Sequence, residues 1–249
     1  MIASPLEQFD IISLIPLSIG KFDISFTNSS LFILMVFTTL FLMFSLATLN
    51  STIVPNRWQV VVEEIYGFIV GLIESNVGEK GKNFFPFVFT LFVFLLFSNL
   101  FGMIPYSFTV TSHIALTFVF GIAIFIGVTI IGLIEHKLHF FSFFLPAGVP
   151  LALAPLLVPI EFISYLSRAI SLPLRLFANM MSGHCLLKII AGFGFAMLTS
   201  ASFGVQLVGL IPVAFVVVIT GLEIGIACLQ AYVFTVLVCQ YLNDAYNLH

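Results

Sequence analysis

Charged side chains stand inside a stretch of sequence that is otherwise suited to lipid. The stretch covers residues 159–192, and its charges are Glu161, Arg168, Arg175 and Lys188. On a helix that turns 100° per residue, steps of 7 and 14 residues keep the first three charges within about 40° of one another, so they share one stripe. An arginine at bilayer depth costs about 2.5 to 3.5 kcal/mol on insertion scales, and such residues face a bundle interior, a water-filled path or a partner. The stripe therefore predicts ionic chemistry inside a membrane.

Arg175 differs from the other charges because the sequence around it offers no counter-charge. Its neighbours are apolar, and no acidic residue lies within ten positions. The partner must therefore come from a distant part of this chain or from another chain. A guanidinium stays protonated and cannot relay a proton, whereas Glu and His can exchange protons near neutral pH when burial shifts them. The candidate relay residues are Glu161, His184, Glu223 and Asp244.

Two long apolar stretches, residues 159–192 and 204–243, must position these side chains. As helices they would measure about 50 and 60 Å, well beyond a hydrocarbon core of about 30 Å, so they must tilt, bend or break. In an antiparallel hairpin that turns near Ser202, residues at equal depth have numbers that add up to a constant. The sum is 405 or 407 for three polar pairs, which are Glu161 with Asp244, Arg175 with Gln230, and His184 with Glu223. Two titratable levels separated by a permanent cation describe a proton path with a barrier.

The composition assigns the whole chain to the membrane. Of 249 residues, 61% are hydrophobic and 8% are charged, against roughly 25% charged in a soluble domain. Apolar spans are expected at 31–49, 84–104 and 114–134, after an N-terminal segment of residues 1–30, and an amphipathic helix at 56–77 is expected to lie in the interface. The predicted fold is a single all-α membrane domain, with about four steep transmembrane or interfacial helices followed by a long, strongly tilted antiparallel helix hairpin.

The charge pattern excludes several kinds of site. A net charge of -3 without a Lys/Arg cluster argues against a nucleic-acid partner. The segment GEKGK at residues 78–82 lacks the spacing of a phosphate loop, so no nucleotide site is expected. His136 and His139 flank Lys137 on a polar connection and are interpreted as solvated residues, and no metal or cofactor is predicted.

Basic residues in the short connections predict the orientation of the chain. The first and third connections together carry four basic residues, which are Arg57, Lys80, Lys82 and Lys137. The second connection carries none. By the positive-inside rule, the N-terminus lies outside, and the first and third connections lie inside.

Two rival classes also bury charges in a membrane. A proton-coupled secondary transporter usually shows paired broken helices in two related halves, and this sequence has no internal repeat. A cofactor-binding respiratory subunit needs paired intramembrane histidines to hold haem, and His184 is the intramembrane candidate. Both classes remain alternatives to a proton-channel subunit.

Several segments carry a specific resemblance to a known family. The first segment is residues 171–184, with Ser171, Leu172, Arg175, Leu176, Asn179, Gly183 and His184. The second part of the resemblance lies near the C-terminus, in Glu223, Gln230 and the ending YLNDAYNLH. Two further segments are GMIPYSFTVTSH at 102–113 and PAGVPLALAPLLV at 146–158. Together they resemble subunit a of the F-type ATP synthases, in its mitochondrial class, over nearly the whole chain. Pro173 is a less usual residue at its position in that family.

The resemblance implies roles for the charged residues. Arg175 is expected to face the essential carboxylate of a rotating c-ring. His184 and Glu223 are expected to line a half-channel from the intermembrane space, and Glu161 and Asp244 a half-channel to the matrix. The implied function is that of a proton-translocating stator subunit with two offset half-channels.

The resemblance also implies the surroundings of the chain. Asn179, Gln230 and Arg168 are expected to support the level of Arg175. The implied partners are the c-ring, other Fo stator subunits including one of the peripheral stalk, and membrane lipid. The expected location is the mitochondrial inner membrane, with a bacterial plasma membrane as the alternative, and the chain itself is expected not to be an enzyme.

Overall fold

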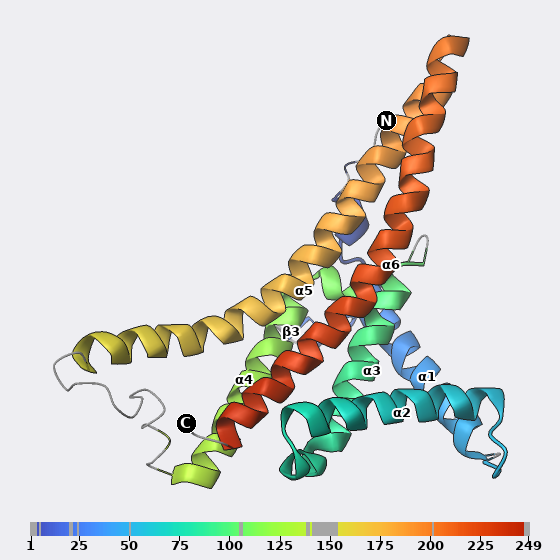
Figure 1. Cartoon of the computed structure of the whole chain (residues 1–249). Coiled ribbons are helices and arrows are strands. Elements are labelled where there is room, and N and C mark those ends of the chain that lie inside the picture. Colours follow the sequence, from blue (N-terminus) through green and yellow to red (C-terminus); the bar gives the residue numbers. More distant parts are fainter. Residues whose placement is uncertain are drawn as a thin grey trace. The chain divides into compact units, whose positions relative to one another are not determined.

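A computed structural model describes residues 4, 6–19, 22–23, 25–49, 51–104, 107–137, 140, 154–200 and 202–246. Six α-helices account for most of these residues (Figure 1). They are α1 (Asn28–Leu49), α2 (Arg57–Asn76), α3 (Phe85–Gly102), α4 (Ile114–His136), α5 (Ala154–Leu198) and α6 (Phe203–Tyr246). Most of the predicted segment at 146–158 lies outside the described residues.

Five helical stretches of the described chain are long and apolar enough to cross a membrane. They contain α1, α3, α4, α5 and α6. The predicted all-α membrane fold is therefore confirmed, and the observed helix ends differ from the predicted ones by a few residues. The largest differences are at α5, which runs from Ala154 to Leu198 rather than from residue 159 to residue 192. Pro155 lies in the first turn of α5. Proline is tolerated there, because the first N–H groups of a helix have no acceptor within the helix.

The amphipathic helix α2 has clear signals at both ends. The side chain of Asn56 accepts a hydrogen bond from the backbone N–H of Arg57 at its start. At its end Gly78 has φ +77°, a conformation that glycine adopts without strain, and its N–H donates to the carbonyl oxygen of Ile73. The buried face of α2 is apolar and consists of Ile69, Leu72 and Ile73.

Short elements complete the described chain. The N-terminal segment contains the strands β1 (Ser13–Ile15), β2 (Ser18–Ile19), β3 (Phe22–Asp23) and β4 (Phe26–Thr27), in which β1 pairs antiparallel with β4 and β2 with β3. Single 3₁₀ turns are η1 (Glu7–Phe9), η2 (Glu79–Phe84) and η3 (Val110–Ser112). The sequence did not predict these strands.

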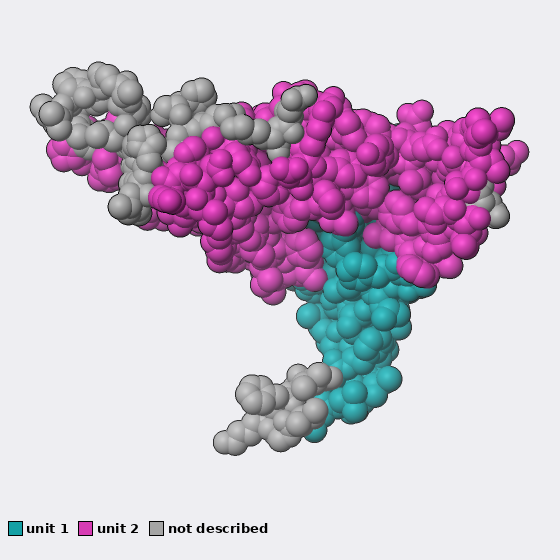
Figure 2. Space-filling model, turned by 90° about the horizontal axis from the view of Figure 1, so that it is seen from below, with its two compact units in different colours: residues 1–39, 94–113, 176–231 teal, residues 40–93, 114–175, 232–249 magenta. Residues whose placement is uncertain are grey.

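The chain divides into two compact units, which Figure 2 shows in different colours. The first unit comprises Met1–Thr39, Phe94–His113 and Leu176–Ala231. The second comprises Leu40–Val93, Ile114–Arg175 and Tyr232–His249. Each unit contains a part of α5 and a part of α6, so each holds its own set of contacts between these two helices.

Within the first unit, α5 and α6 are antiparallel and pack closely at three glycines. A Cβ atom added at Gly183 would lie 2.5 Å from Oε1 of Glu223, one at Gly194 3.3 Å from Cγ2 of Val213, and one at Gly209 3.0 Å from Cβ of Met197. The numbers in each of these pairs add up to 406 or 407. The predicted hairpin is confirmed here with nearly the predicted register, and the missing side chains are what allow the close approach.

Candidate functional site

The first unit brings His184 and Glu223 together, as the hairpin register predicts. Nδ1 of His184, on α5, lies 3.5 Å from Oε1 of Glu223, on α6. The Glu223 side chain is only 3% exposed, and neither of its oxygens has a hydrogen-bond partner among the described residues. A carboxyl group in such a position has a strong tendency to take up a proton or to find a charged partner, because burial disfavours its ionised form.

His184 has a second polar contact, on the other side of its ring. Its Nε2 lies 3.0 Å from the hydroxyl oxygen of Thr109, in the segment between α3 and α4. Both ring nitrogens therefore face groups that can exchange or orient a proton. The sequence analysis did not select Thr109, although polar residues from Thr109 to His113 immediately precede the apolar run of α4.

A large open cavity adjoins His184. Its volume is about 800 Å³, and its lining includes Thr109, His184, Lys188 and the acidic residues Glu7 and Asp10. Lys188 Nζ donates a hydrogen bond to the backbone oxygen of Ser4 at 3.2 Å. The N-terminal segment thus forms one wall of the cavity, and water in this space could reach His184.

Asn99 adds a polar contact between α3 and α6 in the same unit. It is completely buried, and its side-chain amide donates to the backbone oxygen of Ala227 at 3.1 Å. Ala227 lies one helical turn after Glu223, so this bond ties α3 to the part of α6 that carries the buried carboxylate. The sequence analysis missed Asn99 because an amide within an apolar span gives no sign of its partner.

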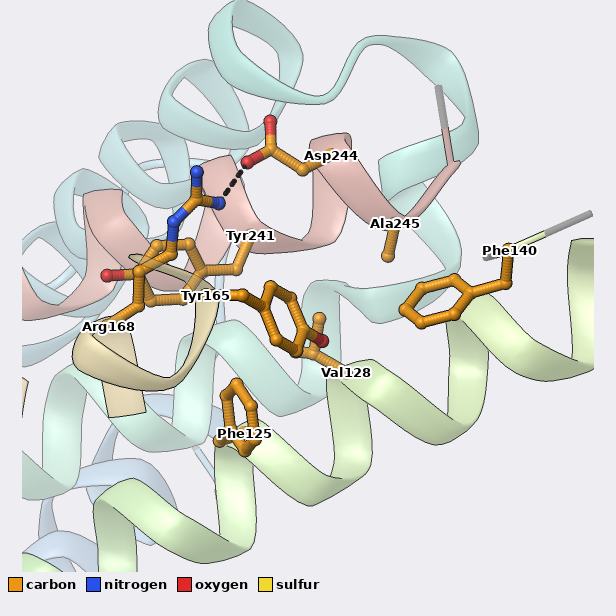
Figure 3. Close-up of a pocket in the computed structure, with 8 residues that line it drawn as sticks. All are labelled: Phe125, Val128, Phe140, Tyr165, Arg168, Tyr241, Asp244 and Ala245. Carbon is orange, nitrogen blue, oxygen red and sulfur yellow. Dashed lines mark hydrogen bonds and ion pairs between the residues drawn. The ribbon is translucent and has the colours of Figure 1, made fainter. Parts of the chain in front are cut away.

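The second unit contains a different ion pair (Figure 3). Nη1 of Arg168, on α5, donates to Oδ2 of Asp244, on α6, at 2.7 Å, and the guanidinium lies 5.6 Å from the centre of the Tyr241 ring. The sequence paired Asp244 with Glu161 in depth, whereas the structure brings Arg168 to Asp244. Glu161 is partly exposed and makes no hydrogen bond or ion pair within the described part of the chain.

Aromatic side chains surround the Arg168–Asp244 pair. Figure 3 shows Tyr165 and Tyr241 beside it, with Phe125 and Phe140 further along the same small pocket. The hydroxyl of Tyr165 makes a 2.7 Å hydrogen bond with that of Thr129, on α4. The accessible space in the pocket is about 20 Å³, enough for about one water molecule by the usual measure.

Arg175 is exposed on α5 and has no hydrogen bond or ion pair with another described residue. Its neighbours Leu172 and Leu176 are buried, so the helix is packed on one side and presents Arg175 on another. Asn179 and Gln230 are partly buried, and their side chains make no hydrogen bond within the described residues. Arg175 belongs to the second unit and Gln230 to the first, and their shared depth stays a prediction.

The described residues include no group of three or more His, Cys, Asp or Glu side chains that could hold a metal ion.

Comparison with known proteins gives one consistent result. The family described as ATP synthase A chain matches residues 29–243. Over 249 residues the chain is 51% identical to ATP synthase subunit a of Chondrus crispus, covering 100% of this chain and 98% of the relative. It is 54% identical over 254 residues to ATP synthase subunit a of Marchantia polymorpha, with 100% of both chains covered, and 53% identical over 252 residues to that of Brassica napus, with 99% and 97% covered.

Proposed function

Because this chain belongs to the ATP synthase A chain family, we propose that it is the subunit that conducts protons through the membrane part of a rotary F-type ATP synthase. Its membership in the family, together with the five apolar helices of the described residues, makes it a multi-pass membrane subunit of the Fo complex. The finer roles of its residues, given below, are parts of the same proposal.

The observation that carries the proposal is the His184–Glu223 pair. A buried carboxylate without a hydrogen bond lies 3.5 Å from an imidazole, and the imidazole borders an open cavity whose walls include polar and charged side chains. A structural ion pair would be expected to satisfy its carboxylate oxygens, because unpaired buried polar groups are costly. A carboxyl group that must bind and release protons has reason to be left unsatisfied. His184 and Glu223 are therefore assigned to the half-channel that opens toward the intermembrane space.

Arg175 is assigned to the boundary between the two half-channels. The exposed position and the lack of a partner in the described chain support a counter-charge on another subunit, and a carboxylate of the c-ring has the required chemistry. Asn179 and Gln230 are assigned as polar support at this level. A fixed guanidinium favours the ionised ring carboxylate and blocks direct passage of a proton between the half-channels.

The second half-channel is assigned to Glu161 and Asp244, opening toward the matrix. Arg168 supports this assignment, because its bond to Asp244 holds two polar side chains beside the small pocket of the second unit. A proton that enters past His184 and Glu223 neutralises a ring carboxylate, which can then turn through lipid. After nearly a full turn the carboxylate releases its proton toward Glu161 and Asp244.

The proposal also covers the location and the partners. The chain is placed in the mitochondrial inner membrane, next to the c-ring, lipid and other Fo stator subunits including one of the peripheral stalk. It is proposed to bind no nucleotide, so the formation of ATP takes place on other subunits. Each charge moved across 100 mV contributes about 2.3 kcal/mol, so a leak between the half-channels would dissipate the driving force.

The substitution Arg175→Ala tests the proposal. We expect it to abolish proton-driven ATP synthesis and to allow passive proton leak that is sensitive to dicyclohexylcarbodiimide, because the barrier between the half-channels is lost. ATP synthesis and proton flux are measured in vesicles that contain the assembled complex. Leu174→Ala is the matched control on the same helical turn, and it should leave both quantities nearly unchanged. Normal coupled synthesis by Arg175→Ala would refute the assignment.

A further inference from the structure

The hydroxyl group of Thr109 lies between two acceptors. Its Oγ1 is 3.0 Å from Nε2 of His184, and it donates to the carbonyl oxygen of Gly102 at 3.4 Å. Thr109 is buried and tightly held, since a Cβ atom added at Gly102 would lie 2.6 Å from its Cγ2. A hydroxyl has one proton and two lone pairs. It can donate to His184, or it can turn to donate to Gly102 and accept from His184.

The orientation of this hydroxyl is linked to the state of Glu223 through the imidazole ring. A neutral imidazole carries its proton on one nitrogen, so the hydrogen bond at Nε2 decides what Nδ1 presents to Oε1 of Glu223, 3.5 Å away. When Thr109 donates, an Nδ1–H group faces an ionised carboxylate. When Thr109 accepts, the lone pair of Nδ1 faces a protonated carboxyl group.

We infer that Thr109 is a positioning residue of the proton path, whose hydroxyl turns between His184 and Gly102 and thereby permits both protonation forms of the His184–Glu223 pair. This inference rests on the proposed function and deepens it. The residue acts through His184 and does not itself carry the translocated proton.

The transfer of one proton takes four steps, in which the number of protons is conserved. A proton from the cavity binds to Nε2 of His184, and the Nδ1 proton passes to Oε1 of Glu223. The Thr109 hydroxyl turns to donate to Gly102 and accepts from the new Nε2–H group. Glu223 then releases its proton inward. His184 then takes up one proton at Nδ1 from water of the cavity and returns its Nε2 proton to the same water, which restores the starting form with one proton moved inward.

Other charged groups also lie near His184, but the hydrogen bond to its Nε2 is made by Thr109. Glu223 faces the ring from α6, and Lys188 lies one turn further along α5. Glu7 and Asp10 of the N-terminal segment line the same cavity. Since Thr109 is the group bonded to Nε2 in the described structure, a change there acts on His184 directly.

The test compares Thr109→Ser, Thr109→Ala and Thr109→Val in vesicles that contain the whole ATP synthase. ATP synthesis is measured at fixed voltage while the pH on the inlet side is varied. Thr109→Ser should stay within about twofold of the natural chain. The Ala and Val variants should be about tenfold slower, the usual cost of losing one such bond at a reacting group. Their half-maximal rate should move to a more acidic inlet pH, because the imidazolium loses its acceptor.

Thr111→Val is the matched control. Thr111 is 1% exposed, lies two residues from Thr109, and its hydroxyl has no hydrogen-bond partner among the described residues, so its rate and pH profile should not change. The inference is overturned if Thr109→Ala equals Thr109→Ser, if Ala slows synthesis without the pH shift, or if Ser and Ala assemble equally poorly. If the Val variant does not assemble, the Ser and Ala pair decides.

A fourth substitution separates this inference from the proposed function. Glu223→Gln should abolish synthesis, because an amide cannot take up the proton. Full synthesis by Glu223→Gln would remove the proposed role of the pair itself. Loss of synthesis in Glu223→Gln together with a normal Thr109→Ala variant would overturn the positioning role alone.

Discussion

At the scale of single residues, Gly183 determines where the carboxylate of Glu223 can lie. A Cβ atom at residue 183 would be 2.5 Å from Oε1 and 2.9 Å from Cδ of Glu223, distances that side-chain atoms do not tolerate. The carboxylate therefore occupies the space that a side chain at this position would fill. The contact between Glu223 and His184 therefore depends on Gly183, the residue just before His184 in α5.

Gly183→Ala should lower proton-driven ATP synthesis by more than tenfold, because the added methyl group pushes the Glu223 carboxylate away from His184. ATP synthesis in vesicles measures the effect. Gly192→Ala is a matched control on α5, since a Cβ atom there meets nothing within 4 Å, and the change from glycine favours the helix. Equal rates for the two variants would show that the carboxylate position is not critical.

Some residues of the site could be predicted from the sequence, and others could not. Charged residues in apolar stretches are conspicuous, so Arg175, His184 and Glu223 were selected, and the hairpin register correctly paired the last two. Thr109 was missed, because a threonine near the end of a span has many ordinary explanations and only the folded chain shows its contact with His184.

At the scale of elements, the Arg168–Asp244 bond connects the first half of α5 to the end of α6. The numbers of this pair add up to 412, compared with 406 or 407 for the pairs of the first unit. The Arg168–Asp244 pair therefore departs from the pairing that was predicted from the sequence for Asp244. A prediction that assumed straight, parallel axes placed Glu161 opposite Asp244, whereas the structure brings Arg168 there, which lies seven residues, or about two helical turns, further along α5.

The Arg168–Asp244 bond should contribute modestly to stability. Arg168→Gln and Asp244→Asn should each lower the free energy of unfolding by a few tenths to about 1 kcal/mol, since both side chains are about one-third exposed and screened. The double variant should be no less stable than either single variant. Heating the detergent-solubilised complex and measuring the folded fraction of this chain provides the values. Fully additive losses would indicate that the two residues act independently.

Pro173, two residues before Arg175, has a specific partner in α4. A Cβ atom at Gly121 would lie 2.7 Å from Cγ of Pro173, so the proline ring packs directly on the glycine. The glycine in α4 thus makes room for the proline ring in α5. The sequence alone could not supply this explanation, because the two residues are 52 positions apart.

At the scale of the whole molecule, the sequence predicted the helices well and the N-terminal segment poorly. Long apolar runs predict membrane helices reliably, because a lipid environment requires backbone groups to bond within the helix. The strands β1 to β4 are only two or three residues long, and so short a pattern does not distinguish a strand from a loop.

The stability of the whole chain should depend on pH through His113. This residue lies just before α4 and stacks on Phe108, and burial lowers the pKa of His113 below its usual value of 6.5. The unfolded chain therefore binds more protons than the folded chain between the lowered pKa and about 6.5, so stability falls as the pH falls through this range.

Thermal unfolding of the solubilised complex at several pH values tests this dependence. The natural chain should lose stability on acidification below about pH 6.5, where the unfolded form of His113 begins to take up its proton. His113→Gln should lose less over the same interval. An identical pH dependence in both chains would assign the effect to other groups.

The glycine contacts between α5 and α6 have a mechanical consequence. Where side chains of one helix pack directly on glycines of the other, a small displacement meets steep repulsion at once, and this part of the pair behaves as one stiff rod. On the proposed function, the neighbouring ring drags on this rod as it turns. The elastic give that smooths rotation is then expected in other parts of the complex, such as the peripheral stalk, and not in the helices that line the proton inlet.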